Sequence, residues 1–246
     1  MFDDINIVLV ETSHPGNIGS VARAMKNMGL RRLTLVSPRY FPHAEATALA
    51  SGADDLLEHA RVVDSLVEAI ADCRFVIGTS ARERRADWPV FEVREAALKV
   101  VEESQRGACA VVFGRERTGL SNDELDRCHA LMQIPTDTAY SSLNLAQAVQ
   151  VVAYELWMAG RVPVSRPESA QARATLAETE YFYGHLERLL IDSGFLNAQA
   201  PKPLMRRIRR MFDRAELQSH EVNILRGILT ALEHSPPTQD KSRNQS

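Results

Sequence analysis

The sequence predicts an α/β protein with a mostly parallel sheet covered by helices on both faces. Two observations support this fold class. Short apolar runs rich in Val, Ile and Leu recur in the first 134 residues, and segments with helical periodicity separate them. Strands that alternate with helices pair in parallel, because each helix returns the chain to the same edge of the sheet. The expected strands are residues 5–10, 33–36, 75–77, 110–113 and 131–134.

The helices expected between these strands have one apolar face. Ile18, Val21, Ala22 and Met25 follow the i, i+3, i+4, i+7 spacing of a helix face, and Gly29 ends that helix. Similar patterns predict further helices over residues 66–71, 94–103, 122–127 and 144–159.

The helix over 144–159 is apolar almost all round, so it needs burial on every side. A crowded core and a dimer interface are the two ways to bury it. Asn144, Gln147, Gln150 and Glu155 interrupt its apolar character, so we expect a buried helix and no membrane span.

The alternation of apolar runs and helical patterns stops after residue 160. Two prolines and no periodicity mark a linker, three helical patterns follow at 176–193, 203–212 and 220–234, and a polar segment ends the chain. We expect four parts: an α/β domain at 1–160, a linker at 161–174, a helical extension at 175–234 and a disordered tail at 235–246.

The net charge, the cysteine and histidine spacing and the amino terminus argue against several classes of protein. The net charge of −3 gives no whole-chain signature of nucleic-acid binding, so any basic surface is local. Cys73, Cys109 and Cys128 are odd in number and lack metal spacing, which predicts buried free thiols and fits a reducing cytoplasm. The histidines show no H-x-x-x-H spacing, and the amino terminus is acidic where a signal peptide is basic. We therefore expect no metal site and a cytoplasmic location.

The segment VVFGRERTGLS, residues 111–121, reads as a buried strand that runs into a tight loop and then a helix. Gly114 and Gly119 suit bends or the close approach of a ligand, and loops at the carboxyl ends of such strands bind ligands. Leu120 follows Gly119 where a Walker loop has Lys, and no GxGxxG is present. Glu116 lies between two arginines, a pattern typical of a surface ion pair as well as of a catalytic acid.

Two further loops combine small and basic residues. In TSHPGNIGSVAR, residues 12–23, Asn17 sits where exposed helix N–H groups favour an anion, and Arg23 lies on the polar helix face. A helix cap beside a solvated basic face is the alternative. In GTSARERR, residues 78–85, a strand ends in small polar residues followed by three arginines, which suits a ligand loop or a solvated loop.

The fourth loop, in IPTDTAYSSLNLAQAV at residues 134–149, crowds polar side chains at the entrance of the apolar helix. Ser141 or Ser142 could cap that helix. A hydrolase nucleophile is not expected, because no G-x-S-x-G elbow is present.

In their order along the chain, these segments closely resemble the SpoU branch of the SPOUT methyltransferase superfamily. Three motifs carry the resemblance over residues 1–160: N-IGSVARA around Asn17 and Arg23, VFGRERTGLS around Glu116, and IPTDTAYSSLNLAQAV around Asn144. Within that branch, VLVETSHPGNIGSVARAMK, GTSARER and YFYGHLE look like the tRNA 2′-O-methyltransferases that act at nucleotide 32 of the anticodon loop.

The resemblance implies a SPOUT-type fold with a deep trefoil knot in the carboxyl-terminal part of the α/β domain. It implies a homodimer whose active site draws on both subunits. It also implies S-adenosylmethionine as the methyl donor, with no metal in the chemistry. Carried over by motif, the cofactor pocket consists of strand-end and loop residues: Thr79, Ser80, Ala81, Gly114, Ile134, Ser141, Ser142 and Leu143.

The implied reaction is methyl transfer to the ribose 2′-hydroxyl of tRNA nucleotide 32. Arg23 is the key catalytic residue, which we expect to clamp the adjacent phosphate and stabilise the developing alkoxide. Asn17, Ser142 and Asn144 would orient the ribose and the arginine, and Glu116 would hold a basic partner. A ribosomal RNA 2′-O-methyltransferase of the same superfamily and a non-catalytic RNA-binding protein with this fold are the alternatives.

Arginine-bearing surfaces are the expected contacts with RNA, because they neutralise phosphates. In the helix over 203–212, Leu204, Ile208, Met211 and Phe212 form the expected apolar stripe and leave the arginines outward. A solvated helix face is the alternative there. The expected RNA-binding residues are Arg82, Arg84, Arg85, Lys202, Arg206, Arg207, Arg209 and Arg210.

Overall fold

The computed structural model describes residues 2–81, 88–162 and 172–234. The chain forms two compact units, Met1–Ala177 and Glu178–Ser246. Three of the expected RNA-binding residues (Arg82, Arg84 and Arg85), most of the expected linker and the expected tail lie outside the described residues.

The first unit is built on a seven-stranded sheet in the order β3-β2-β1-β6-β4-β7-β5, and all of its strand pairings are parallel. This confirms the predicted parallel sheet and places β1, β6 and β4 in its centre, where the sequence is most apolar. The strands are β1 (Ile5–Val10), β2 (Arg32–Val36), β3 (Arg61–Val63), β4 (Phe75–Thr79), β5 (Val90–Glu92), β6 (Cys109–Phe113) and β7 (Ala130–Gln133).

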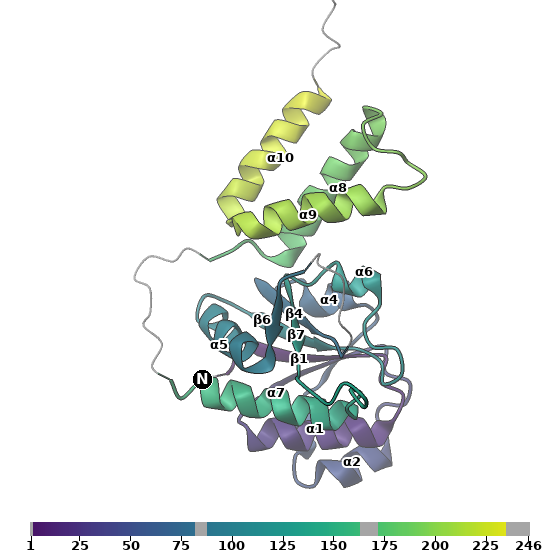
Figure 1. Ribbon diagram of the computed structural model, residues 1–246, viewed down its shortest axis with the longest axis vertical. Helices are drawn as coiled ribbons and strands as arrows, with labels where there is room; N and C mark the ends of the chain where they lie inside the picture. The colour runs from purple at the N-terminus through teal and green to yellow at the C-terminus, as the bar shows by residue number, and fades with distance from the viewer. Residues whose placement is uncertain (1, 82–87, 163–171, 235–246) are drawn as a thin grey trace, which may run out of the picture. The chain divides into compact units, whose positions relative to one another are not determined.

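Helices cover both faces of the sheet, as predicted (Figure 1). Ile5, Ile7 and Leu9 of β1 pack with α1, α5 and α7, whereas Val8 and Val10 point to the opposite face, which α4 and α6 cover. The two-residue period of a strand produces this division. The helices of this unit are α1 (Pro15–Asn27), α2 (Ala44–Ala50), α3 (Asp54–Glu58), α4 (Leu66–Ile70), α5 (Val93–Ser104), α6 (Asn122–Leu125) and α7 (Leu145–Ala159).

Helix α7 is buried on one side only within this unit, which differs from the expectation of burial all round. Val149, Val152 and Leu156 are fully buried against α1 and α5. On the other side, Tyr154 is 48% exposed and Met158 is 43% exposed. Among the described residues, no helix has both the length and the apolar character that a membrane crossing requires.

The three cysteines are free and buried, as predicted. Burial raises the pKa of the Cys73 thiol to about 11 and raises that of Cys109 further. A thiol with so high a pKa is a poor nucleophile at neutral pH. Cys73, Cys109 and Cys128 therefore act as small core residues.

The segment that leads into the second unit is held against the first by a buried ion pair. Arg173, 9% exposed, binds Glu103, 3% exposed, at 3.4 Å, and its guanidinium lies over the Phe75 ring. The backbone N–H groups of Leu176 and Ala177 donate to carbonyls at the end of α4 and beyond it. The end of the expected linker is thus part of the first unit.

The second unit contains α8 (Leu176–Asp192), α9 (Lys202–Ala215) and α10 (Ser219–Glu233). Its core contains Phe182, which meets Phe212 edge to face at 5.1 Å, together with Met205. Met211, expected in the apolar stripe of α9, is 52% exposed. The buried face of α9 therefore contains Met205 in place of Met211.

Two α9 arginines expected to point outward are used inside the unit. Arg209 is ion-paired with Glu180, with one contact at 3.1 Å, and its guanidinium lies over the Tyr183 ring at 4.4 Å. Arg210 is 8% exposed and binds Asp213. The expected solvent-facing stripe of arginines is therefore narrower than the sequence pattern indicates.

Candidate active site

A cavity of about 300 Å³ lies at the carboxyl ends of β4, β6 and β7. Three loops form its walls: the residues after β4, the loop between β6 and α6, and the segment that precedes α7. Every residue that the resemblance assigned to the cofactor lines this cavity, namely Thr79, Ser80, Ala81, Gly114, Ile134, Ser141, Ser142 and Leu143. Leu120, Leu125 and Met132, which were not predicted, add to the apolar part of the lining.

The loop between β6 and α6 folds back on itself. The Gly119 N–H donates to the Arg115 carbonyl at 2.9 Å, and Gly119 has a φ of 68°, which favours glycine. A Cβ at Gly114 would lie 2.2 Å from the Leu120 nitrogen. Of the two reasons considered for a glycine here, a bend and the close approach of a ligand, the tight bend of the loop's own backbone already requires Gly114.

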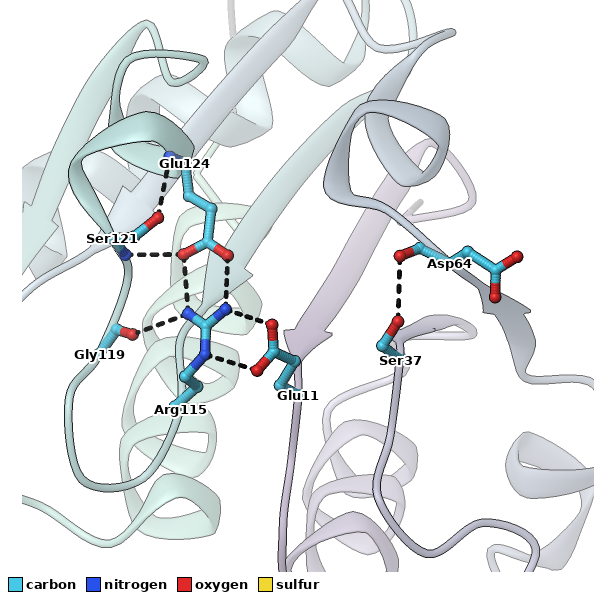
Figure 2. A network of polar contacts seen from close by, with 7 residues as sticks. All are labelled: Glu11, Ser37, Asp64, Arg115, Gly119, Ser121 and Glu124. Carbon is cyan, nitrogen blue, oxygen red and sulfur yellow. Dashed lines mark hydrogen bonds and ion pairs between the residues drawn. The ribbon is translucent and has the colours of Figure 1, made fainter.

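Arg115 ties this loop to two glutamates (Figure 2). Its guanidinium binds Glu11, with one contact at 2.8 Å, and makes two contacts of 3.0 Å with Glu124. Glu124 also closes the capping box of α6 with Ser121. The ion pairs with Glu11 and then Glu124 raise the pKa of Arg115 above its usual range. Arg115 thus fixes one wall of the cavity as a permanent cation.

Glu11 takes up an uncommon backbone conformation at the end of β1. Its φ is 47°, in the left-handed region, while its N–H donates to the Val36 carbonyl at 2.8 Å. Ser37 repeats this arrangement at the end of β2, with a φ of 43° and a side-chain bond to the Asp64 carbonyl (Figure 2). Non-glycine residues in this region often mark functional sites, because the surrounding structure must stabilise them.

The Glu116 carboxylate accepts hydrogen bonds from the loop that begins α1. The donors are the Ser13 N–H and hydroxyl, the His14 N–H and the Asn17 side-chain amide, at 3.1–3.3 Å. We had expected Glu116 to hold a basic partner, and these donors are all neutral. The carboxylate instead satisfies the exposed N–H groups near the amino terminus of α1, where a negative charge is favoured.

Asn17 continues the network to the third motif. Its side-chain oxygen accepts from the Asn144 amide at 3.0 Å, and the Asn144 oxygen accepts from the Ala146 and Gln147 N–H groups. Asn144 is therefore the cap of α7, a role that we had considered for Ser141 or Ser142. His14 occupies the cap position of α1 without a side-chain bond, so Asn17 is not a helix cap either.

The hydrogen bonds to Glu116 favour its charged form. Burial raises the pKa of this carboxyl, but bonds from its own backbone N–H, from Asn17 and from Ser13 outweigh that effect and lower the pKa below the ordinary value of 4.5. Glu116 is consequently ionised at neutral pH and acts toward these donors only as a hydrogen-bond acceptor. Its hydrogen bonds join the loop after β6 to the loop that begins α1.

Arg23 lies farther along α1, exposed, and does not line the cavity. Among the described residues no carboxylate pairs with it, whereas its neighbour Lys26 binds Asp55 at 2.7 Å. Within one copy of the protein, hydrogen bonds thus join Asn17, Glu116 and Asn144 into one network. Arg23 lies outside the cavity, and no carboxylate among the described residues pairs with it.

A profile of the SpoU rRNA Methylase family matches residues 4–154. The chain belongs to this family. A second profile, the C-terminal domain of the tRNA methyltransferase TrmJ, matches residues 177–245. The cavity therefore lies in the SpoU methylase part of the chain.

The names of individual proteins that are similar to this chain are consistent with the family assignment. The tRNA (cytidine/uridine/adenosine-2′-O-)-methyltransferase TrmJ of Pseudomonas aeruginosa is 51% identical over 94% of both chains. The crystal structure of TrmJ from Z. mobilis ZM4 is 37% identical, covers 93% of this chain and 98% of its own, and has a TM-score of 0.82. AviRb of Streptomyces viridochromogenes, solved with AdoMet, shares the fold at 22% identity and a TM-score of 0.52, over 64% of this chain and 61% of its own.

Sequence reasoning missed the residues that hold the motifs together. Ser13 and Glu11 were not predicted as site residues, because a serine after a strand and an exposed glutamate occur in most proteins. Arg115 was noted only as a neighbour of Glu116. Its partners lie 104 and 9 residues away, so only the folded chain shows that they meet.

Proposed function

We propose that this protein methylates the ribose 2′-hydroxyl of nucleotide 32 in the tRNA anticodon loop, with S-adenosylmethionine as the donor. The observation that supports it best is the junction of the three motif loops through Glu116, Asn17 and Asn144 beside the cavity. The Pseudomonas relative, 51% identical, carries the name of a tRNA 2′-O-methyltransferase. Reduced thiols and a tRNA substrate fit a cytoplasmic location.

The cavity suits S-adenosylmethionine in size and lining. Its volume of about 300 Å³ is at the lower end of that of small-molecule sites. Leu120, Met132 and Ile134 supply apolar contacts for an adenine ring, while Thr79 and Ser141 supply polar groups. When bound, this cofactor supplies an electrophilic methyl group on a sulfonium. No metal is needed for such a transfer.

The protein's contribution to the reaction is alignment and charge stabilisation. A guanidinium is a poor general base, so Arg23 is not proposed as the proton acceptor. Its planar fork instead clamps the phosphate next to the target ribose and stabilises the developing alkoxide. Ser142, Asn17 and Asn144 orient the ribose and the arginine, and Glu116 fixes the two asparagines.

We propose that two copies of the chain form the active enzyme. Arg23 lies outside the cavity of its own chain, and α7 exposes Tyr154 and Met158 on the side away from the core. Pairing through α7 would bury these side chains and would bring Arg23 of one copy to the cavity of the other. The carboxyl-terminal trefoil knot remains a prediction from the family resemblance.

Contacts with tRNA are proposed for two basic groups. Of the α9 residues, Arg209 and Arg210 hold the second unit together, so they contribute to RNA binding mainly by positioning that helix. The direct contacts are proposed for Lys202, Arg206 and Arg207, and for the loop residues Arg82, Arg84 and Arg85.

Mass spectrometry of tRNA from a strain that lacks this protein tests the proposal. The purified protein is incubated with that tRNA and S-adenosylmethionine, and the ribose methyl groups are mapped. A methyl group that appears at nucleotide 32 supports the proposal. Methylation of ribosomal RNA in place of tRNA would favour the alternative activity that the SpoU family name carries. Absence of both transfer and cofactor binding would favour a non-catalytic RNA-binding protein.

A further inference from the structure

The second unit has a hollow of its own between α8 and α10, with a volume of about 420 Å³. On each helix the lining residues follow the spacing of a single face, so two helix faces form the two walls. Tyr181, His185 and Arg188 come from α8, and the residues from α10 are Asn223, Arg226, Gly227, Thr230 and Glu233. We call this hollow the α8–α10 groove.

Arg226 is the most unusual group in the groove. Its guanidinium lies 4.2 Å from the centre of the Tyr181 ring, and Tyr181 is 63% exposed. In the part of the chain that the structure describes, Arg226 pairs with no carboxylate, and its buried Nε has no hydrogen-bond acceptor. The charge of this guanidinium is therefore available to an anion that enters the groove.

Glu233, the one carboxylate among the described residues that line the groove, is engaged by two other lining residues. Glu233 binds His185 at 3.2 Å and lies 3.9 Å from Arg188. It therefore leaves the charge of Arg226 uncompensated, and the groove carries an excess of positive charge. An anion with several acceptor oxygens, such as a phosphate, matches the fork of an arginine.

Two glycines lie in the middle of the helices that form the groove. Gly184 lies on the same face of α8 as Tyr181 and Arg188, and Gly227 lines the groove on α10. A Cβ at either position would meet nothing within 4 Å, so internal packing does not require glycine. Glycine inside a helix is less stabilising than alanine. Gly227 therefore leaves its part of the groove without a side chain.

We propose that the α8–α10 groove is a binding site for the sugar–phosphate backbone of the tRNA substrate. A phosphate binds Arg226, and an unstacked base or ribose packs on the exposed Tyr181 ring, the combination by which proteins hold single-stranded RNA. Arg188 adds a second cation at the rim. This inference rests on the proposed function, because it takes tRNA as the substrate, and it places a contact on a face of the second unit other than α9.

The test compares five full-length variants. Arg226→Gln removes the charge, Arg226→Lys keeps the charge without the fork, Tyr181→Ala removes the ring, Tyr181→Phe keeps it, and Gly227→Leu fills the groove without changing any charge. Arg31→Gln, at an exposed site in the first unit, is the matched charge control. Affinity for an unmodified tRNA transcript is measured by fluorescence anisotropy at several salt concentrations, S-adenosylmethionine binding by calorimetry, and folding by thermal denaturation.

The groove inference predicts a loss of tRNA affinity of about tenfold in Tyr181→Ala, Arg226→Gln and Gly227→Leu, with the cofactor affinity unchanged. Arg226→Gln also lowers the salt slope of binding by about 1. Tyr181→Phe and Arg31→Gln bind like wild type, and Arg226→Lys is intermediate.

Wild-type tRNA affinity in Tyr181→Ala and in a folded Gly227→Leu would overturn the inference while leaving the proposed function intact. If Arg226→Gln does not fold, Gly227→Leu and Tyr181→Ala still decide. Binding of an acidic peptide in the groove, with no competition from tRNA, would also overturn it. Failure of the wild-type protein to bind or methylate tRNA would instead refute the proposed function itself.

Discussion

The Asn17 amide donates a hydrogen bond of 3.1 Å to the Glu116 carboxylate, across 99 residues of sequence. Asn17 in turn accepts from Asn144 at 3.0 Å, across 127 residues. Each of the three residues belongs to a different motif, and each motif ends a different strand or opens a different helix. The network thus sets the mutual positions of the three loops at the carboxyl edge of the sheet.

Glu116→Gln should impair catalysis and change the pH dependence of stability. The substitution replaces one acceptor oxygen with a donor that faces other donors, so we expect kcat to fall about tenfold or more, with little change in cofactor affinity. Because the folded-state pKa of Glu116 is lowered, its contribution to stability is present above pH 4.5 and is lost as the pH falls through the lower folded value.

Urea unfolding at pH 7 and at successively lower pH measures this contribution. Wild type should lose its stability advantage over Glu116→Gln as the pH falls below 4.5. Glu95→Gln, at an exposed site on α5, is the control and should follow wild type. An equal difference in stability between wild type and Glu116→Gln at every pH would contradict the network described above.

Arg115→Ala should weaken cofactor binding by about tenfold or more, because hydrogen bonds to charged groups are each worth about 1.5–3 kcal/mol. Arg115 touches Glu11 and Glu124 and positions the loop that lines the cavity. Arg115→Lys keeps the charge without the two-pronged geometry and should restore part of the affinity. Calorimetry with S-adenosylmethionine measures both. If the alanine variant instead lowers kcat at unchanged cofactor affinity, Arg115 does not act through the cavity wall.

Arg23→Ala should abolish methyl transfer while S-adenosylmethionine still binds, because Arg23 does not line the cavity. Arg23→Lys should retain little activity, since an ammonium cannot make the bidentate contact of a guanidinium. Radiolabelled methyl transfer and calorimetry on the same preparations separate the two effects. Turnover like that of wild type in the alanine variant would refute the assignment of Arg23.

Glu103→Ala should destabilise the first unit by about 3–5 kcal/mol, because it removes a buried carboxylate that contacts Arg173, Arg106 and Lys99. The neighbouring Glu102, whose side chain is 44% exposed, pairs with Arg106 and offers a matched control. Glu102→Ala should change stability by about 1 kcal/mol or less. Chemical denaturation of the full chain measures both. Equal effects would show that burial of the Glu103–Arg173 pair is energetically unimportant.

The sequence predicts the central elements of the fold better than its edges. β1 was predicted from Ile5 to Val10 and is found there, because a fully buried parallel strand is a continuous apolar run. β3 and β5 were not predicted, since each spans three residues and lies at an edge of the sheet, where apolar residues are not required. Short helices such as α2, with seven residues, have too few turns for an apolar periodicity to be recognised in the sequence.

For the site, the sequence identifies the residues but not their partners. The cofactor residues predicted from the motifs all line one cavity. A glutamate between two arginines suggests a basic partner, whereas the donors found for Glu116 among the described residues are neutral groups of the loop that begins α1. Arg209 was expected outside because helix periodicity does not show that Glu180 and Tyr183 of another helix would meet it.

A matched pair of tRNA substrates tests most directly whether the ribose 2′-hydroxyl of nucleotide 32 is the acceptor. Two tRNA molecules are prepared that differ only in a 2′-hydroxyl or a 2′-hydrogen at nucleotide 32, and methyl transfer from labelled S-adenosylmethionine is measured with the full-length protein. We predict methyl transfer to the substrate with the 2′-hydroxyl and none to the 2′-deoxy substrate. Equal transfer to both would contradict it.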